Sequence, residues 1–416
     1  MPFHQQIALL AVGLILARWL AEIWLAVLNR RHVQAHAGKL PEAFQGLMDD
    51  TTYAKSIDYT MARSRLGIFS DTLGVVVLLV VLFSGVLPAA FAWTLQHTSG
   101  SAWMMAAFLF VVGMAMALPG LPVDWFEQFK LEERFGFNTM TPGTWWLDRV
   151  KMLLLAAVLG YPLLVLLLKF VEWTGHWWWL WAWAALLVFQ FLMMVLAPVL
   201  IMPLFYKFTP LPEGTLRDRL VKLADRTAFH AASIQVMDGS KRSRHSNAFF
   251  TGFGRLRKIV LFDTLLTQLS EAELEAVLAH EIGHYKRKHI VKLLVWSALS
   301  SLVGFWSIAW LAQQEWFYRA FGFTPGHVAP ALLVFTLLAG TITFWISPVQ
   351  NWWSRRFEYE ADEFARHAMG EPTPLVGALR KLHEKNLSNL TPHPAYSGFY
   401  YSHPTLLERE QALVAR

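Results

Sequence analysis

Residues 278–285 read LAHEIGHY and place His280 and His284 four positions apart, with Glu281 directly after the first histidine. The stretch follows Ser270 and a run of Ala, Leu and Glu, which predicts a helix that Ser270 caps at its N-terminus. Residues four apart lie on one face of a helix, so the two imidazoles can bind one Zn²⁺. Glu281 can then accept a proton from a water molecule that attacks a peptide carbonyl. The pattern predicts a zinc-dependent peptidase.

A histidine pair at this spacing also occurs by chance. The alternative is a transporter or lipid-binding membrane protein in which the pair is incidental. Two features favour the metal site. The predicted context is a capped helix, as the chemistry requires, and two histidines on a helix of Ala, Leu and Glu have no packing role that Leu would not fill better.

The composition predicts an integral membrane protein. The 416 residues are 55% hydrophobic and only 16% charged, with a mean hydropathy of +0.37, whereas a soluble domain carries roughly a quarter charged residues. The formal net charge of +6 arises from Lys and Arg at the ends of apolar runs, which indicates contact with a lipid bilayer and argues against nucleic-acid binding. The chain has no cysteine, so any metal must be held by histidine and carboxylate side chains.

Several apolar stretches are long enough to cross about 30 Å of hydrocarbon as helices. There are seven: residues 7–28, 66–92, 102–123, 151–171, 177–202, 289–313 and 327–349. The first contains Arg18 and Glu22, which can pair along the helix or face a wet interior, and no basic segment precedes it. We therefore interpret it as a retained span and not as a signal peptide. The sequence predicts an α-helical polytopic membrane protein with seven transmembrane helices.

Basic residues predict the orientation of the chain in the membrane. The segment 29–65 is rich in Lys and Arg, whereas the loops 93–101 and 172–176 have none. The positive-inside bias therefore places the catalytic segments and the C-terminus in the cytoplasm and the N-terminus outside.

The segment before the sixth span is predicted to be a small cytoplasmic α+β unit. Residues 215–228 have a helical pattern, and 234–237, 246–251 and 258–262 have the composition of strands, the last two joined by a turn that holds Gly252 and Gly254. The predicted division is residues 1–202 with five spans, the catalytic segment 203–288, residues 289–349 with two spans, and the C-terminal segment 350–416.

A catalytic zinc needs a third protein ligand. Residues 354–365, SRRFEYEADEFA, follow the last apolar stretch and place Glu358 and Asp362 on one helical face. One of them can bind the metal while the other orients a histidine from behind. Glu360 points to a different side and is a weaker candidate. Taken alone, this run would read as an acidic helix in solvent.

Five separated motifs together resemble the type I CAAX prenyl proteases, which are integral-membrane zinc metalloendopeptidases of the gluzincin type. The motifs are HEIGH at 280–284, the run 354–362, YSHP at 401–404 with Glu408 and Arg409, FGFN at 135–138, and DGS at 238–240 with SNA at 246–248. The fold that the resemblance implies is a barrel of seven helices around a water-filled chamber, with the zinc site facing inward.

The resemblance also implies a role for each site residue. His280, His284 and Glu358 would bind zinc, and Glu281 would be the general base. Asn247 and Ala248 would lie on a strand that binds extended substrate.

His403 and Arg409 would approach the metal and stabilise the oxyanion that develops during hydrolysis. Asp362 remains the residue that supports a ligand from behind.

The expected cofactor is one Zn²⁺ per chain, and the expected partner is a peptide or protein substrate, prenylated or otherwise associated with the membrane. A quality-control protease that degrades misfolded membrane proteins by the same chemistry is the alternative. The sequence has no endoplasmic-reticulum retrieval signal, and its compact length favours a bacterial homologue in the inner membrane over a protein of the endoplasmic reticulum.

Overall fold

The structure, a computed structural model, describes residues 1–416 except 39, 47, 230–232, 252–257 and 416. Six helical segments of the described chain are long and apolar enough to cross a membrane: Phe3–Ala35, Asp50–Phe83, Ala102–Phe135, Pro142–Leu204, His289–Leu311 and Val328–Met369. The predicted multi-pass helical membrane protein is thus confirmed.

One of these segments accounts for two predicted spans. Pro142–Leu204 has 63 residues, whereas one crossing needs only about 20. The chain turns at Gly175, so that α8 (Tyr161–Thr174) and α9 (Trp178–Leu196) pack against each other. The predicted stretches 151–171 and 177–202 are therefore separate arms of a helical hairpin.

The predicted stretch 66–92 is wrong in its bounds. Helix α2 (Asp50–Phe83) begins earlier and ends before Gly85, whose φ of 81° lies in the left-handed region that glycine favours. A separate helix, α3 (Val86–His97), follows. The break escapes a hydropathy pattern because the residues on both sides of it are apolar.

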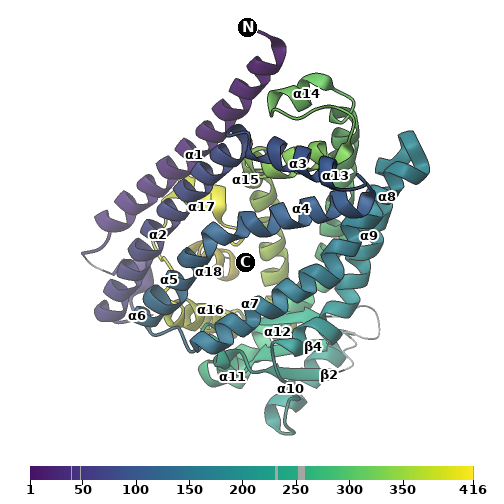
Figure 1. Cartoon of the computed structure of the whole chain (residues 1–416). Coiled ribbons are helices and arrows are strands. Elements are labelled where there is room, and N and C mark those ends of the chain that lie inside the picture. The colour runs from purple at the N-terminus through teal and green to yellow at the C-terminus, as the bar shows by residue number, and fades with distance from the viewer. Residues whose placement is uncertain (39, 47, 230–232, 252–257, 416) are drawn as a thin grey trace.

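The long helices surround a polar cavity. Helix α1 (Phe3–Ala35) packs along α2, and the C-terminal helices lie between these two and the rest of the molecule (Figure 1). A cavity of about 770 Å³ is lined by Glu22, Tyr59, Asp71 and His403 among others. Arg18 Nε donates to Glu22 Oε1 at 2.8 Å, so the predicted pair forms within α1. These features agree with the expected helical barrel and its inner chamber.

A small four-stranded sheet forms the α+β unit. Its order is β1 (Phe208–Pro210), β2 (Ser233–Met237), β4 (Lys258–Phe262) and β3 (Ala248–Thr251). Only the β2–β4 pair is parallel. The three predicted strands are present, β1 was not predicted, and the predicted turn with Gly252 and Gly254 lies outside the described residues.

Two helices carry the site and pack closely together. Helix α12 (Glu271–Lys286) begins with the predicted Ser270 cap, which is a full capping box with Glu273. Helix α15 (Val328–Met369) runs without a break from the last apolar stretch to the acidic residues, with Pro348 inside it. The 349/350 division therefore falls within one continuous helix.

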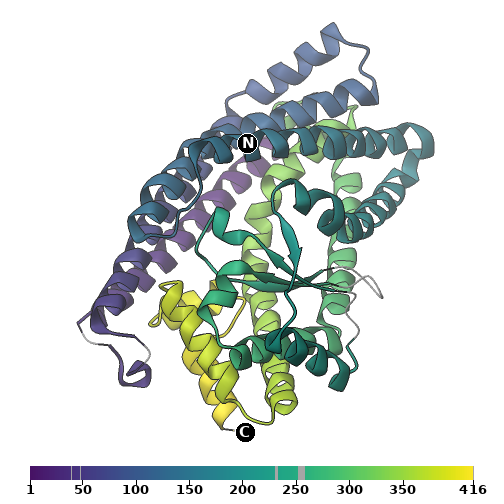
Figure 2. The ribbon, with the colours of Figure 1, turned by 90° about the horizontal axis from the view of Figure 1, so that it is seen from below.

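The remaining helices complete the fold (Figures 1 and 2). They are α4 (Ala102–Ala117), α5 (Leu121–Phe126), the π-helical turn η3 (Glu127–Glu132), α6 (Glu133–Phe135), α7 (Pro142–Leu155), α10 (Thr215–Arg226), α11 (Asp263–Gln268), α13 (His289–Leu311), α14 (Glu315–Ala320), α16 (Thr373–Lys385), α17 (Pro394–Tyr400) and α18 (Leu406–Val414). The short helix α6, which follows the third span, ends at Gly136, at a φ of 86°.

Candidate metal centre

The two histidines of α12 point their Nε2 atoms at each other. Both are on the face of α12 that packs against α15, and their Nε2 atoms are 3.1 Å apart. Gly283, which lies between them, permits this packing. A Cβ at this position would be 2.9 Å from the Cα of Ala361 on α15. The HEIGH stretch thus supplies two imidazoles and the small residue that brings a second helix close to them.

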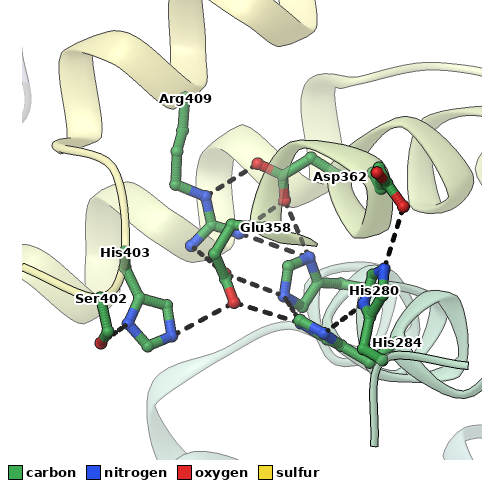
Figure 3. A network of polar contacts seen from close by, with 9 residues as sticks. His280, His284, Glu358, Asp362, Ser402, His403 and Arg409 are labelled. Atoms are coloured by element: carbon green, nitrogen blue, oxygen red, sulfur yellow. Dashed lines mark hydrogen bonds and ion pairs between the residues drawn. The ribbon is translucent and has the colours of Figure 1, made fainter. Parts of the chain in front are cut away.

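Helix α15 brings a carboxylate to the histidine pair. Glu358 Oε2 is 3.4 Å from His280 Nε2, and Glu358 Oε1 is 3.3 Å from His284 Nε2 (Figure 3). Ligand atoms about 2.0–2.1 Å from a tetrahedral Zn²⁺ lie about 3.3 Å from one another. The three separations therefore match the edges of a coordination tetrahedron.

The hydrogen bonds around His280 and Glu358 leave free lone pairs that a cation can bind. Asp362 accepts the Nδ1–H of His280 at 2.8 Å, which leaves a lone pair on Nε2. Glu358 is only 4% exposed, and its Oε2 has no hydrogen-bond donor among the described residues. Buried acceptors that face one another repel unless a cation lies between them. His280, His284 and Glu358 can therefore hold a metal ion.

A buried ion pair supports the first histidine. Arg409 of α18 donates from Nε to Asp362 Oδ2 at 2.8 Å and from Nη2 to Oδ1, while its Nη1 lies 3.6 Å from Glu358 Oε2. Both Arg409 and Asp362 are buried. The guanidinium keeps Asp362 charged and in place, and Asp362 in turn fixes the ring of His280.

The second histidine has its own support, which the sequence did not predict. His284 Nδ1 and His289 Nδ1 are 3.0 Å apart, and His289 Nε2 is 3.1 Å from Glu360 Oε2. If His289 donates its Nε2–H to Glu360, its Nδ1 accepts from His284, and the Nε2 lone pair of His284 faces the metal position. His289 is 1% exposed and stacks on Phe357 at 4.1 Å.

The sequence signal for His289 is weak. It ends the basic run 286–289, which suggests a surface loop, and its partner Glu360 is distant in the chain. Only the packing of α12, α13 and α15 brings the two together.

Two further predicted residues lie beside this group. Burial raises the pKa of the Glu281 carboxyl, which suits a group that must accept a proton near neutral pH. His403 Nε2 is 3.4 Å from Glu358 Oε1, and its Nδ1 contacts Ser402 Oγ at 3.0 Å. Because His403 also lines the 770 Å³ cavity, it connects that cavity to the metal-binding group.

Asn247 and Ala248 lie at the edge of the sheet. The backbone carbonyl of Asn247 accepts a hydrogen bond from the Phe262 amide at 3.1 Å, and Ala248 is the first residue of β3. Among the described residues β3 pairs only with β4, and it also packs against α12. A strand edge next to the histidine helix can pair with an extended peptide.

Comparisons with known proteins agree with this geometry. Residues 29–207 match a family model described as CAAX prenyl protease N-terminal, five membrane helices, and residues 210–416 match peptidase family M48. CAAX prenyl protease 1 of Saccharomyces cerevisiae is 37% identical over 92% of this chain and 90% of its own. The Homo sapiens homologue is 31% identical over 96% and 94%.

A solved structure extends the agreement to the fold. The crystal structure of S. mikatae Ste24p superposes with a TM-score of 0.89 at 34% identity and covers 98% of both chains. The metal-binding group, the helical membrane fold and these matches over nearly the whole chain lead to one conclusion. The chain belongs to the CAAX prenyl protease 1 family of integral-membrane metallopeptidases.

Proposed function

We propose that this chain is a zinc-dependent endopeptidase that cleaves prenylated, CAAX-type membrane-associated proteins. The observation that carries the proposal is the approach of His280, His284 and Glu358 to within 3.1–3.4 Å of one another at their ligand atoms. A donor set of two imidazoles and one carboxylate, without thiolates, is typical of catalytic zinc sites.

Each residue of the site would have a separate role in hydrolysis. Zn²⁺ bound there would act as a Lewis acid and lower the pKa of a water molecule. Glu281 would accept the proton of the attacking water on its carboxylate and pass it to the leaving amine. His403, through Nε2–H, would donate to the oxyanion that forms from the scissile carbonyl.

Arg409 and Asp362 would act mainly by holding the metal ligands in position. Asp362 would hold His280 in the tautomer that leaves Nε2 free for the metal. Arg409 would keep Asp362 in position and place a positive charge beside Glu358, where it would also favour a developing oxyanion.

The substrate would bind as an extended segment along β3, with Asn247 and Ala248 at the start of the strand. The edge position of β3 and its packing against α12 support this placement. The prenyl group would be held by the membrane or by the apolar parts of the barrel.

For the orientation, we propose that the N-terminus is outside and that the catalytic segments and C-terminus are cytoplasmic, with the protein in a bacterial inner membrane. The support for the orientation is the clustering of Lys and Arg in 29–65.

Mass spectrometry of peptide products tests the proposal. The purified protein should release only the tripeptide that follows a prenylated cysteine, should leave the unprenylated peptide intact, and should lose activity with a zinc chelator. Cleavage at many internal positions, regardless of prenylation, would instead identify a quality-control protease. Hydrolysis that resists the chelator would contradict the metal chemistry itself.

A further inference from the structure

An apolar groove lies between α2 and the α5–α6 segment, two elements that Figure 1 labels. It encloses about 850 Å³. Leu66 and Phe69 of α2 and Val123 and Phe126 of α5 contribute apolar walls. Arg63, Gly67 and Asp71 of α2 line the inner cavity instead. They lie on a different side of the helix from Arg65 and Phe69, so the groove opens away from that cavity.

The groove carries positive charge that nothing in the described chain neutralises. Its lining includes Arg65, Lys130 and Arg134 and no carboxylate. All three cations are exposed, and none forms an ion pair with a described residue. They form a distinct basic edge on an otherwise apolar surface.

Glu127 and Glu132 of the same segment face the other way, whereas Glu133 is exposed. Glu127 pairs with Arg63 at 3.5 Å, and Glu132 accepts from the Tyr59 hydroxyl at 2.7 Å. Both line a second cavity on the inner side. Glu127 and Glu132 are therefore turned away from the groove, whereas Lys130 and Arg134 line it.

The three cations lie near the ends of apolar helical stretches. Arg65 directly precedes the apolar part of α2, and Lys130 and Arg134 follow the apolar part of α4–α5 after the acidic residues Asp124 and Glu127. Basic residues that flank a span lie at the bilayer surface, which would place the three cations there and Phe69 and Val123 deeper. The groove thus combines a site for an anion at the interface with an apolar channel below it.

We propose that this groove binds one anionic phospholipid. Its phosphate would contact Arg65, Lys130 and Arg134, and one acyl chain would lie along Leu66, Phe69 and Phe126. Guanidinium and ammonium groups recognise phosphate oxygens well. A zwitterionic lipid would bring its own cation toward three positive charges and would bind less tightly. The site is separate from the metal centre and does not depend on the proposed substrate.

Native mass spectrometry of the full-length protein in detergent tests the proposal. The probes are phosphatidylglycerol and phosphatidylcholine with identical acyl chains. We expect one phosphatidylglycerol per chain, retained about tenfold over phosphatidylcholine. The variant Arg65→Gln/Lys130→Gln/Arg134→Gln should lose this preference.

A matched variant controls for overall charge. Arg31→Gln/Lys55→Gln/Lys207→Gln removes the same number of exposed cations outside the groove and should keep the preference. Phe69→Ala/Phe126→Ala leaves the charges and removes apolar walls, so it should weaken retention of both lipids. Thermal unfolding and zinc content verify that each variant is folded.

Three results would overturn the proposal. The first is equal retention of the two lipids by the unaltered protein, which would indicate only bulk bilayer contact. The second is an equal loss of preference in both charge variants. The third is displacement of the lipid by glycerol phosphate alone, which would indicate a headgroup site without a role for the groove.

Discussion

Asp362 accepts a hydrogen bond from Nδ1–H of His280 at 2.8 Å, and this contact determines which nitrogen of the histidine faces the metal position. The two residues come from α15 and α12 and are both buried. Replacing Asp362 by Ala should weaken zinc binding about 10–100-fold, because the His280 ring loses its fixed tautomer and orientation. Competition with a chelator measures this affinity.

The control is His367→Ala, which removes an exposed imidazole from the same helix. It should leave zinc affinity unchanged. If the Asp362 variant binds zinc as tightly as the unaltered protein, the carboxylate does not support the ligand.

Glu281→Gln should separate metal binding from chemistry. The three ligands remain, but the amide cannot accept a proton, so kcat should fall by about 10²–10⁴ while zinc content stays near one per chain. Glu271→Gln makes the same change in the first turn of α12 and should retain activity. Full activity of the Glu281 variant would remove Glu281 from the reaction.

His289 should affect zinc affinity indirectly, through the orientation of His284. His289→Leu keeps the buried volume but removes the acceptor of the His284 Nδ1–H, so zinc affinity should fall about tenfold or more. His289→Asn places an amide oxygen near the position of Nδ1 and should recover part of the loss. If the two variants lose the same affinity, His289 contributes packing and not orientation.

Gly283→Ala should separate α12 from α15. The added Cβ would lie 2.9–3.1 Å from Ala361 and Phe364, an overpacking that costs about 1–3 kcal/mol. Zinc content should fall with stability, because the ligands sit on these two helices. Gly304→Ala meets nothing within 4 Å and should change the free energy of unfolding by no more than about 1 kcal/mol. Thermal unfolding of the two variants measures these changes in stability.

The sequence predicted those parts of the site that are encoded locally. Ser270 and the HEIGH spacing predict a capped helix with two imidazoles on one face, and the capping box and the 3.1 Å approach of the rings confirm this geometry. Glu358 could be nominated because a third ligand is required and the run 354–365 supplies a carboxylate pair.

Features that depend on distant contacts could not be predicted. The support of His284 by His289 and Glu360 exists only because three helices pack together. The change from apolar to charged composition suggested a division at 349/350, and the sequence did not show that α15 continues through it as one helix. The break at Gly85 was missed for the opposite reason, since the composition does not change across it.

The most direct test of the account compares zinc content after two substitutions on one helix. Glu358→Ala removes a carboxylate that lies 3.3–3.4 Å from both histidine Nε2 atoms, whereas Glu360→Ala removes one that contacts His289. Inductively coupled plasma mass spectrometry of the purified proteins should find zinc largely lost from the Glu358 variant and close to one per chain in the Glu360 variant. Near-stoichiometric zinc in the Glu358 variant, or its loss only from the Glu360 variant, would contradict the proposed metal centre.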